Sequence, residues 1–311
     1  MKENISISLF EQLQDRFDEL GLKSETQFKG MQYAKPLTYW DYIQTDALLS
    51  LQIQRTIVPD EMVFIMYHQV NELLFKMVLW EINQVSNCVD EQLTIELFKE
   101  KINRISRYFD MLTSSFAIMK DGMSKDQYLQ FRNTLAPASG FQSSQYRLIE
   151  FACTDWRNLI DKRFIDKLKE NISEKEALEY LYWQAAGKDY QTGEKSYLLK
   201  AFEDKYCEIF VKAMKDYEKT NLWQKFVMLP EEARSDKELI EAMRHLDKTI
   251  NVTWVLGHYH TAEKYLDDDV KGVQEATGGS DWKKYMLPQY QKRIFFPELW
   301  SKEEIDNWGL V

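Results

Sequence analysis

A histidine stands in one of the most apolar stretches of the chain, at His68. Phe64 lies four residues before it and Glu72 four residues after it, so a helix would place the three side chains on one face. Burying an unpaired imidazole costs free energy, so His68 must either hydrogen-bond a neighbour or face a cavity. A core histidine bonded to a neighbour is the simpler explanation of the pattern, and a ligand-facing histidine is the functional one.

Tyr128 and Arg132 are also four residues apart. On a helix they would be neighbours, and an arginine can bind both oxygens of a carboxylate through two parallel hydrogen bonds. A surface arginine lying over a tyrosine ring is the simpler alternative. The residues that follow, 137–143, are rich in small side chains and would permit close approach of the backbone to a ligand.

His258 lies in an aromatic stretch, with Trp254 before it and His260 after it. Zinc binding by both histidines is disfavoured, because residues two apart point to different sides of a helix. One histidine on a buried helix could instead be the single axial ligand of a haem, and Gly257 would let a flat macrocycle approach the backbone. A lone histidine can also be an ordinary core residue.

A short glycine-bearing segment runs from Thr277 through Gly278 and Gly279 to Ser280. Paired glycines between hydroxyl side chains could hold a phosphate, but the lysine and the preceding strand of a phosphate-binding loop are missing from this segment. A mobile loop that closes over a small ligand fits the same residues, and so does an ordinary linker.

The composition indicates that helices position these residues. The 311 residues include only 11 glycines and 6 prolines, whereas 44% are hydrophobic and 14% are aromatic. Such a chain can bury a large core but has few turn-forming residues, which predicts an all-α fold and argues against a β-sandwich, collagen or a disulfide scaffold. The spacing of apolar residues predicts helices over residues 37–49, 58–87, 90–120, 124–135, 142–153 and 239–266. Thr38 is a possible N-cap of the first, and Pro59 followed by the acidic pair Asp60 and Glu61 opens the second.

The predicted helix over 58–87 carries apolar residues around nearly its whole circumference, so we expect it to be central and buried. The stretch 155–235 is more charged, and we expect a smaller peripheral helical insertion there. The chain then divides into an N-terminal arm (1–36), a first core segment (37–154), the insertion, and a final segment (236–311) that completes the core.

Charge and cysteine usage narrow the class of partner. The formal net charge is −10, opposite in sign to that of a typical nucleic-acid-binding protein. The most apolar stretch, 62–80, contains polar and charged residues that a membrane span would not tolerate. Three widely spaced cysteines form no disulfide framework, and the N-terminus has no apolar signal segment. We therefore expect a cytoplasmic protein with a small-molecule partner, and no nucleic-acid or membrane partner.

Seven segments, in order along the chain and covering most of residues 37–300, resemble the tryptophan 2,3-dioxygenase family. They are Leu-Thr-Tyr-x-x-Tyr from Leu37, Asp-Glu-Met-x-Phe-Ile-x-x-His-Gln from Asp60, Glu-Leu-x-x-Lys from Glu72, Tyr-x-x-Phe-Arg from Tyr128, Ser-Gly-Phe-Gln-Ser-x-Gln-Tyr-Arg from Ser139, Thr-Gly-Gly-Ser from Thr277 and Phe-Phe-Pro-Glu-Leu from Phe295. The resemblance implies a large helical bundle around a pocket for haem b, ferrous in the active form. It also implies that the indole ring of L-tryptophan is opened with O2 to give N-formyl-L-kynurenine, the first step of tryptophan degradation by the kynurenine pathway.

The resemblance also assigns roles to the residues singled out above. His258 matches the proximal ligand of the haem iron. His68 matches the distal, catalytic histidine, which in the family hydrogen-bonds the indole N–H. Phe64 matches the aromatic wall of the indole pocket, and Arg132, with Tyr128 beside it, matches the residue that pairs with the substrate carboxylate.

Further roles fall on loop and N-terminal residues. Thr277 matches the loop threonine that contacts the ammonium and carboxylate end of the substrate, and Ser139 lies at the family's distal-side serine, next to the haem. Tyr39, Tyr42 and Ile43 fall where the N-terminal segment of a neighbouring subunit closes the pocket. The family is homotetrameric, so the resemblance implies a shared site.

Two other functions remain possible on these residues. The first is a haem-dependent aromatic monooxygenase that acts on another indole or aromatic amino acid. The second is a helical haem-binding sensor with no catalytic activity. One departure from the family bears on the substrate loop, because Ala276 stands where the family often has a glycine before the threonine.

Overall fold

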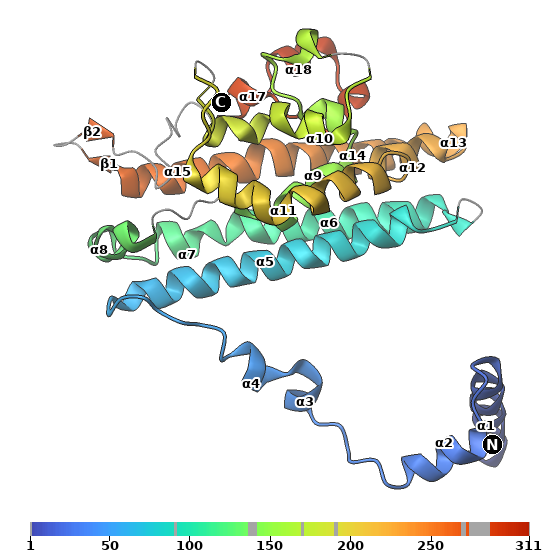
Figure 1. Cartoon of the computed structure of the whole chain (residues 1–311). Coiled ribbons are helices and arrows are strands. Elements are labelled where there is room, and N and C mark those ends of the chain that lie inside the picture. The colour runs from blue at the N-terminus through green and yellow to red at the C-terminus, as the bar shows by residue number, and fades with distance from the viewer. Residues whose placement is uncertain are drawn as a thin grey trace. The chain divides into compact units, whose positions relative to one another are not determined.

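The computed structural model describes residues 2–89, 92–135, 142–168, 171–189, 192–268, 272–273 and 287–310. These residues are predominantly helical, which confirms the predicted all-α class (Figure 1). Their strands are limited to β1 (Asp267–Asp268) and β2 (Gly272–Val273), which pair antiparallel. Within the same ranges, no helix combines the length and the apolar character that crossing a membrane requires.

The chain forms two compact units, and the first covers residues 1–52. Its helices are α1 (Lys2–Glu19), α2 (Ser24–Met31), α3 (Tyr39–Ile43) and α4 (Thr45–Leu48). Thr38 caps α3, as predicted, by accepting a hydrogen bond from the Asp41 amide. The single helix predicted over 37–49 is wrong, because Gln44 adopts a left-handed conformation (φ 58°) that separates α3 from α4.

The second unit, residues 53–311, is organised around a long helix, α5 (Pro59–Ser86). It packs along α6 (Ile95–Ser114) and α9 (Ser144–Cys153), and Figure 1 shows α5 and α6 running side by side. The other α-helices of this unit are α7 (Phe116–Lys120), α8 (Lys125–Leu135), α10 (Glu174–Ala177), α11 (Tyr197–Asp216), α12 (Leu222–Met228), α13 (Glu231–Arg234), α14 (Lys237–Lys248), α15 (Trp254–Leu266), α17 (Pro288–Gln291) and α18 (Lys302–Asp306).

The expectation that α5 is buried on all sides is wrong for one face. Its ends are as predicted, because Pro59 opens the helix and Asn87 caps it. Five apolar side chains spaced alternately four and three residues apart nevertheless remain 43% to 69% exposed. They form one stripe along the helix and are Met66, Val70, Leu73, Met77 and Trp80.

The hydrophobic core has a large and a small part. The large part joins α5, α6, α9, α11, α12 and α14, and it includes Trp183 and Phe202 from the stretch 155–235. The small part contains Tyr67, Phe131 and Tyr265 among other residues, and lies where α5, α7, α8 and α15 meet. This small cluster brings together the helices that carry the predicted site residues.

The predicted helix over 239–266 is helical throughout, but a π-helical turn (Thr249–Thr253) separates α14 from α15. Just before this turn, the buried carboxylate of Asp247 holds the C-terminal segment. It accepts hydrogen bonds from the amides of Phe295 (2.9 Å) and Phe296 (3.1 Å) and from Trp300 Nε1 (3.0 Å). The C-terminal segment is thereby fixed to α14, which leads through the π turn into α15 and His258.

Candidate functional site

His68 lies on α5 and has a defined tautomer. Its Nδ1 is 2.7 Å from the carbonyl oxygen of Phe64, and a carbonyl can only accept, so Nδ1 carries the hydrogen. In the neutral ring Nε2 is then a free acceptor. Neighbouring atoms crowd the ring, and this burial lowers the pKa of His68, although the bond to Phe64 and the charge of Glu72 partly oppose the effect. As a whole residue His68 is nevertheless exposed, so it does not fill a core position.

Aromatic side chains from α5 and α8 form a wall beside His68. The Phe64 ring lies 4.1 Å from the imidazole, between ring centres, and 5.6 Å from Phe131. Tyr128 completes the wall, 6.2 Å from Phe64 and 4.6 Å from Tyr265 of α15. The wall is therefore apolar, with rings inclined to one another, and it has one hydrogen-bond acceptor at its edge.

Arg132 is buried, with only 8% of its surface exposed, which contradicts the alternative of a surface arginine over a tyrosine ring. It donates a hydrogen bond to the hydroxyl of Tyr128, one helical turn before it. A guanidinium held at the edge of an aromatic wall can bind a carboxylate whose apolar body lies against that wall.

His258 reaches the same region from α15. Burial lowers the pKa of His258 to about 4, and the His68 ring contributes, because charge on one imidazole disfavours charge on the other. The two histidines, 190 positions apart in sequence, are joined by a chain of ring contacts, because Tyr67 packs on His68 (5.5 Å) and on Phe116 (6.4 Å), and Phe116 packs on His258 (5.9 Å). Both are favoured in the neutral form. Across the described part of the chain, the His258 ring has aromatic neighbours but makes no hydrogen bond.

The expectation that Gly257 leaves room for a macrocycle is wrong. A Cβ at this position would lie 2.7 Å from Cδ2 of Phe116, so the bare backbone accommodates the Phe116 ring. That ring is also 5.9 Å from His258. Phe116 is a residue of the site that the sequence pattern did not single out.

The donor set fits a cofactor that brings most of its own iron ligands. Among the described residues, no three His, Cys, Asp or Glu side chains converge on a point where they could hold a metal ion. One neutral imidazole from each of two helices suits a haem, which needs one axial ligand and a polar group near its other face. His260 does not join this pair, since it is exposed and bonded to Glu263 at 3.1 Å.

The remaining predicted site residues fall outside the described residues or in the first unit. Ser139 and Thr277 lie outside the described residues. Tyr39, Tyr42 and Ile43 belong to the first unit, where their side chains are 71%, 73% and 43% exposed.

Asp60 also positions the site, although sequence reasoning gave it only a role at the start of a helix. Its Oδ2 accepts a hydrogen bond from the amide of Ser124 (2.8 Å), the residue before α8. Its own amide donates to Oε1 of Gln127 (3.0 Å). The first turns of α5 and α8 are thereby joined, which fixes Tyr128 and Arg132 relative to His68. Asp60 begins one of the seven segments quoted in the sequence analysis, and this position is the only sequence signal that could have indicated its role.

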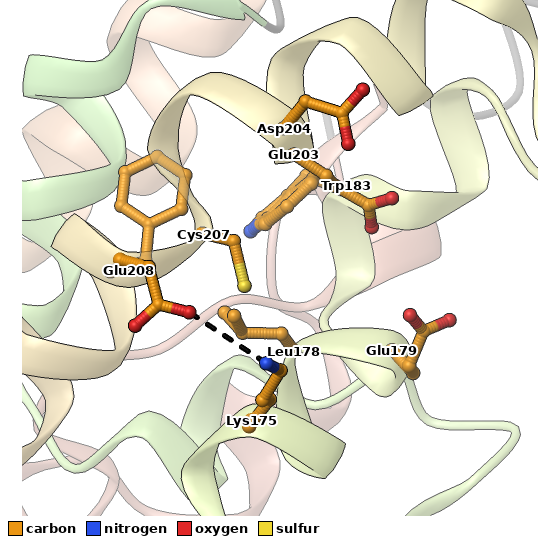
Figure 2. Close-up of a pocket in the computed structure, with 9 residues that line it drawn as sticks. Lys175, Leu178, Glu179, Trp183, Glu203, Asp204, Cys207 and Glu208 are labelled. Atoms are coloured by element: carbon orange, nitrogen blue, oxygen red, sulfur yellow. Dashed lines mark ion pairs between the residues drawn. The ribbon is translucent and has the colours of Figure 1, made fainter.

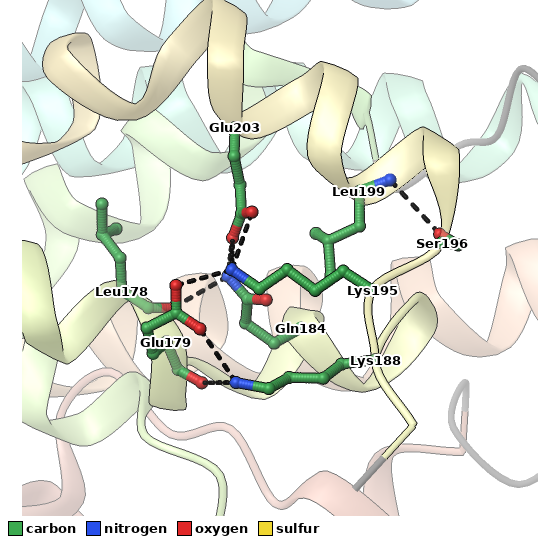
Figure 3. Close-up of polar contacts among 8 residues, drawn as sticks. All are labelled: Leu178, Glu179, Gln184, Lys188, Lys195, Ser196, Leu199 and Glu203. Carbon is green, nitrogen blue, oxygen red and sulfur yellow. Dashed lines mark hydrogen bonds and ion pairs between the residues drawn. The ribbon is translucent and has the colours of Figure 1, made fainter. Parts of the chain in front are cut away.

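A cavity of about 330 Å³ lies elsewhere, between α10 and α11. Figure 2 shows Lys175 paired with Glu208 (3.7 Å) across it, with Cys207 between them. Close by, Lys195 bridges the carboxylates of Glu179 (2.5 Å) and Glu203 (2.8 Å), as Figure 3 shows. None of the predicted site residues lines this cavity.

Comparison with known proteins gives one consistent result. The family model described as tryptophan 2,3-dioxygenase matches residues 24–256, which include the stretch 155–235. A protein of Ruegeria sp. strain TM1040 with that name is 29% identical over 291 residues, covering 87% of this chain and 93% of the relative. One from Bradyrhizobium diazoefficiens is 24% identical, covering 93% and 98% respectively. One from Bacillus anthracis is 37% identical over 120 residues, 39% of this chain and 42% of the relative.

Proposed function

Since the chain belongs to the tryptophan 2,3-dioxygenase family and is an oxidoreductase that opens the indole ring of tryptophan with O2, we propose that it does so with a haem b held by His258. When bound, haem supplies the redox chemistry for dioxygen. The product is N-formyl-L-kynurenine, with both atoms of O2 added across C2 and C3 of the indole. The family match does not favour the monooxygenase alternative.

One observation carries the assignment of the site: ring contacts through Tyr67 and Phe116 connect the imidazoles of α5 and α15, and the same aromatic cluster extends through Phe64 and Tyr128 to the buried Arg132. A neutral imidazole is the form that binds iron, and the low pKa of His258 keeps it in that form. One axial histidine leaves the opposite face of a haem open for O2 and substrate.

His68 orients the substrate in this proposal. Because Nδ1 donates to the Phe64 carbonyl, Nε2 is directed to accept the indole N–H, and the Phe64 ring supports the indole plane. An acceptor in a site that excludes water discriminates strongly against rings that lack the N–H, since it would then be left unpaired.

Arg132 binds the carboxylate of the amino acid, with Tyr128 holding the guanidinium. Thr277 at the ammonium and carboxylate end, and Ser139 on the distal side of the haem, complete the pocket by their match to the family. This set of contacts selects an α-amino acid with an indole side chain.

The first unit closes the pocket of a neighbouring subunit in a homotetramer. The high exposure of Tyr39 and Tyr42 and the exposed stripe on α5 support this assembly, because exposed apolar groups of this size favour association. Free thiols at Cys88, Cys153 and Cys207 support a reducing, cytoplasmic location.

The deciding experiment mixes ferrous, haem-loaded protein with L-tryptophan and ¹⁸O₂ and weighs the product. Two labelled oxygen atoms are expected in N-formylkynurenine. A product with one labelled atom would identify a monooxygenase. Haem absorbance without tryptophan-dependent oxygen uptake would identify a sensor.

The pH dependence of catalysis tests His68. Its lowered pKa means that Nε2 stays unprotonated below the ordinary histidine range, so kcat/KM is expected to hold as pH falls through about 6.5 and to decline only below it. Glu72→Gln removes the charge that raises the pKa of His68, and should move the acid limb to lower pH still. The measurement is kcat/KM from about pH 8 to about pH 5. An acid limb centred at or above about 6.5, or one that Glu72→Gln moves upward, contradicts the assignment.

Asp60→Ala tests the junction of α5 and α8. Loss of its bond to the Ser124 amide removes a helix-capping contact and should cost about 1 kcal/mol of stability. Because Arg132 is displaced but retained, KM for tryptophan should rise several-fold with a smaller change in kcat. Asp126→Ala, which changes an exposed residue in the first turn of the same helix, is the matched control and should leave KM unchanged. Equal effects of the two variants on KM contradict the prediction.

A further inference from the structure

Three aromatic rings stand in a row behind the site. The His258 imidazole lies 6.0 Å from the Trp254 indole, between ring centres, and the two planes differ by only 12°. Trp254 in turn stacks on Tyr146 of α9 at 5.0 Å and 25°. The row therefore runs from the proposed iron ligand on α15 into the core of the second unit.

Phe116 packs on two members of the row. Its ring centre is 5.9 Å from both His258 and Trp254, and it occupies the space that Gly257 leaves by lacking a side chain. Rotation of the imidazole about its bond to Cβ would drive it against the Trp254 and Phe116 rings. The aromatic neighbours therefore restrict the orientation of His258.

Tyr146, at the far end of the row, is held by a buried charged group. Arg293 donates a hydrogen bond to its hydroxyl (3.2 Å), and the guanidinium of Arg147 lies 4.7 Å above its ring. Both arginines pair with Glu150, at 2.7 Å and 2.9 Å. Buried, hydrogen-bonded ion pairs of this kind have little freedom to move, so the platform under Trp254 is rigid.

Metal-binding histidines are usually oriented by a hydrogen bond from the ring nitrogen that does not bind the metal. Throughout the ranges that the structure describes, His258 makes no such bond, and it has the stacked row instead. We infer that Trp254 is the positioning residue for His258, setting the plane of the imidazole toward the haem through ring stacking on the Tyr146 platform. This inference rests on the proposed function, because it requires His258 to be the axial ligand.

Trp254 acts here as a flat surface and not as a donor. Its Nε1 is buried and has no hydrogen-bond partner among the described residues. A phenylalanine would therefore keep a ring against His258 without losing a bond. A methionine would fill much of the same space but offer no flat face.

The test compares Trp254→Met, Trp254→Phe and Trp183→Met, each loaded with haem. Trp183 is the matched control, since it is a buried tryptophan that packs edge-on against Phe202 and Phe210, in contacts that do not involve His258. Two readouts report on the ligand: the iron–histidine stretching band in resonance Raman spectra and the rate of haem transfer to apomyoglobin. Thermal unfolding measures the general cost of each change.

Trp254→Met should shift or broaden the iron–histidine band and speed haem loss by about 10- to 100-fold, the size typical for loss of a group that orients a metal ligand. Trp254→Phe should restore both readouts toward the wild type. Trp183→Met should lower the unfolding temperature while leaving both haem readouts unchanged. If Trp254→Met does not fold, Phe116→Leu removes the other ring against His258 and should change the same two readouts.

Unchanged haem readouts in Trp254→Met, or equal changes in Trp183→Met, overturn the inference and leave the proposed function intact. A wild-type protein without an iron–histidine band overturns the assignment of His258 as ligand, and the inference with it.

Discussion

His258→Ala is expected to reduce haem content from a full complement to nearly none. In the proposed site the His258 imidazole is the axial ligand of the iron, and alanine at this position supplies no donor atom. Haem content per chain is measured by the pyridine haemochrome absorbance after reconstitution and gel filtration, and tryptophan turnover should fall with it.

His260→Ala is the matched control for this change. It removes the other histidine of the same helix, which is exposed and bonded to Glu263, and it should leave haem content unchanged. Added imidazole should restore part of the haem binding in His258→Ala by entering the space left by the side chain. Full haem retention by His258→Ala without imidazole would show that the iron ligand lies elsewhere.

Arg132→Leu is expected to lower kcat/KM for L-tryptophan by about 30- to 5,000-fold. Removing one partner of a buried, hydrogen-bonded charge pair costs roughly 2–5 kcal/mol, because the carboxylate is still desolvated but is no longer paired. Arg132→Lys keeps the charge but loses the two parallel hydrogen bonds, so it should fall between the wild type and leucine. Steady-state kinetics of the three proteins measures the effect.

A substrate lacking the carboxylate separates recognition from general damage to the site. Tryptamine turnover, slow in the wild type, should change little in Arg132→Leu, because the deleted interaction is already absent. Tyr128→Phe removes only the hydroxyl that holds the guanidinium and should cost about 1 kcal/mol, less than tenfold in kcat/KM. Equal losses for tryptophan and tryptamine in Arg132→Leu would show that Arg132 supports the fold and does not recognise the carboxylate.

Local sequence signals predicted most of the helices. Thr38 and Pro59 are predicted at the starts of helices and occur there, because capping and the fixed φ of proline are properties of a few adjacent residues. The break at Gln44 was not predicted, since no glycine or proline marks it. The exposed stripe on α5 was also missed, because hydrophobicity shows that a side chain requires a partner but not which chain supplies it.

For the site too, local sequence signals predicted the pairs within one helix but not the contacts between helices. Spacing by four residues identified Phe64 with His68 and Tyr128 with Arg132, since each pair lies on one helix. The connection of His68 and His258 by ring contacts depends on the packing of α5 and α15 around a shared cluster, which no local pattern encodes. Asp60 and Phe116 support the site only through contacts between helices, so their types alone gave no reason to choose them. Trp254 lies four residues before His258 on α15, so the same spacing could have identified it.

The π turn between α14 and α15 determines the angular phase of His258. In an unbroken α-helix, 18 residues make about five turns, so Gly257 would point in the same direction as the buried Leu239. A single π turn takes up about one additional residue, so His258, and not Gly257, points in the direction of Leu239. A helical wheel drawn over 239–266 thus assigns the wrong residue to the inward face. A one-residue offset, five to nine positions before the histidine, selects the side chain that is presented to the iron.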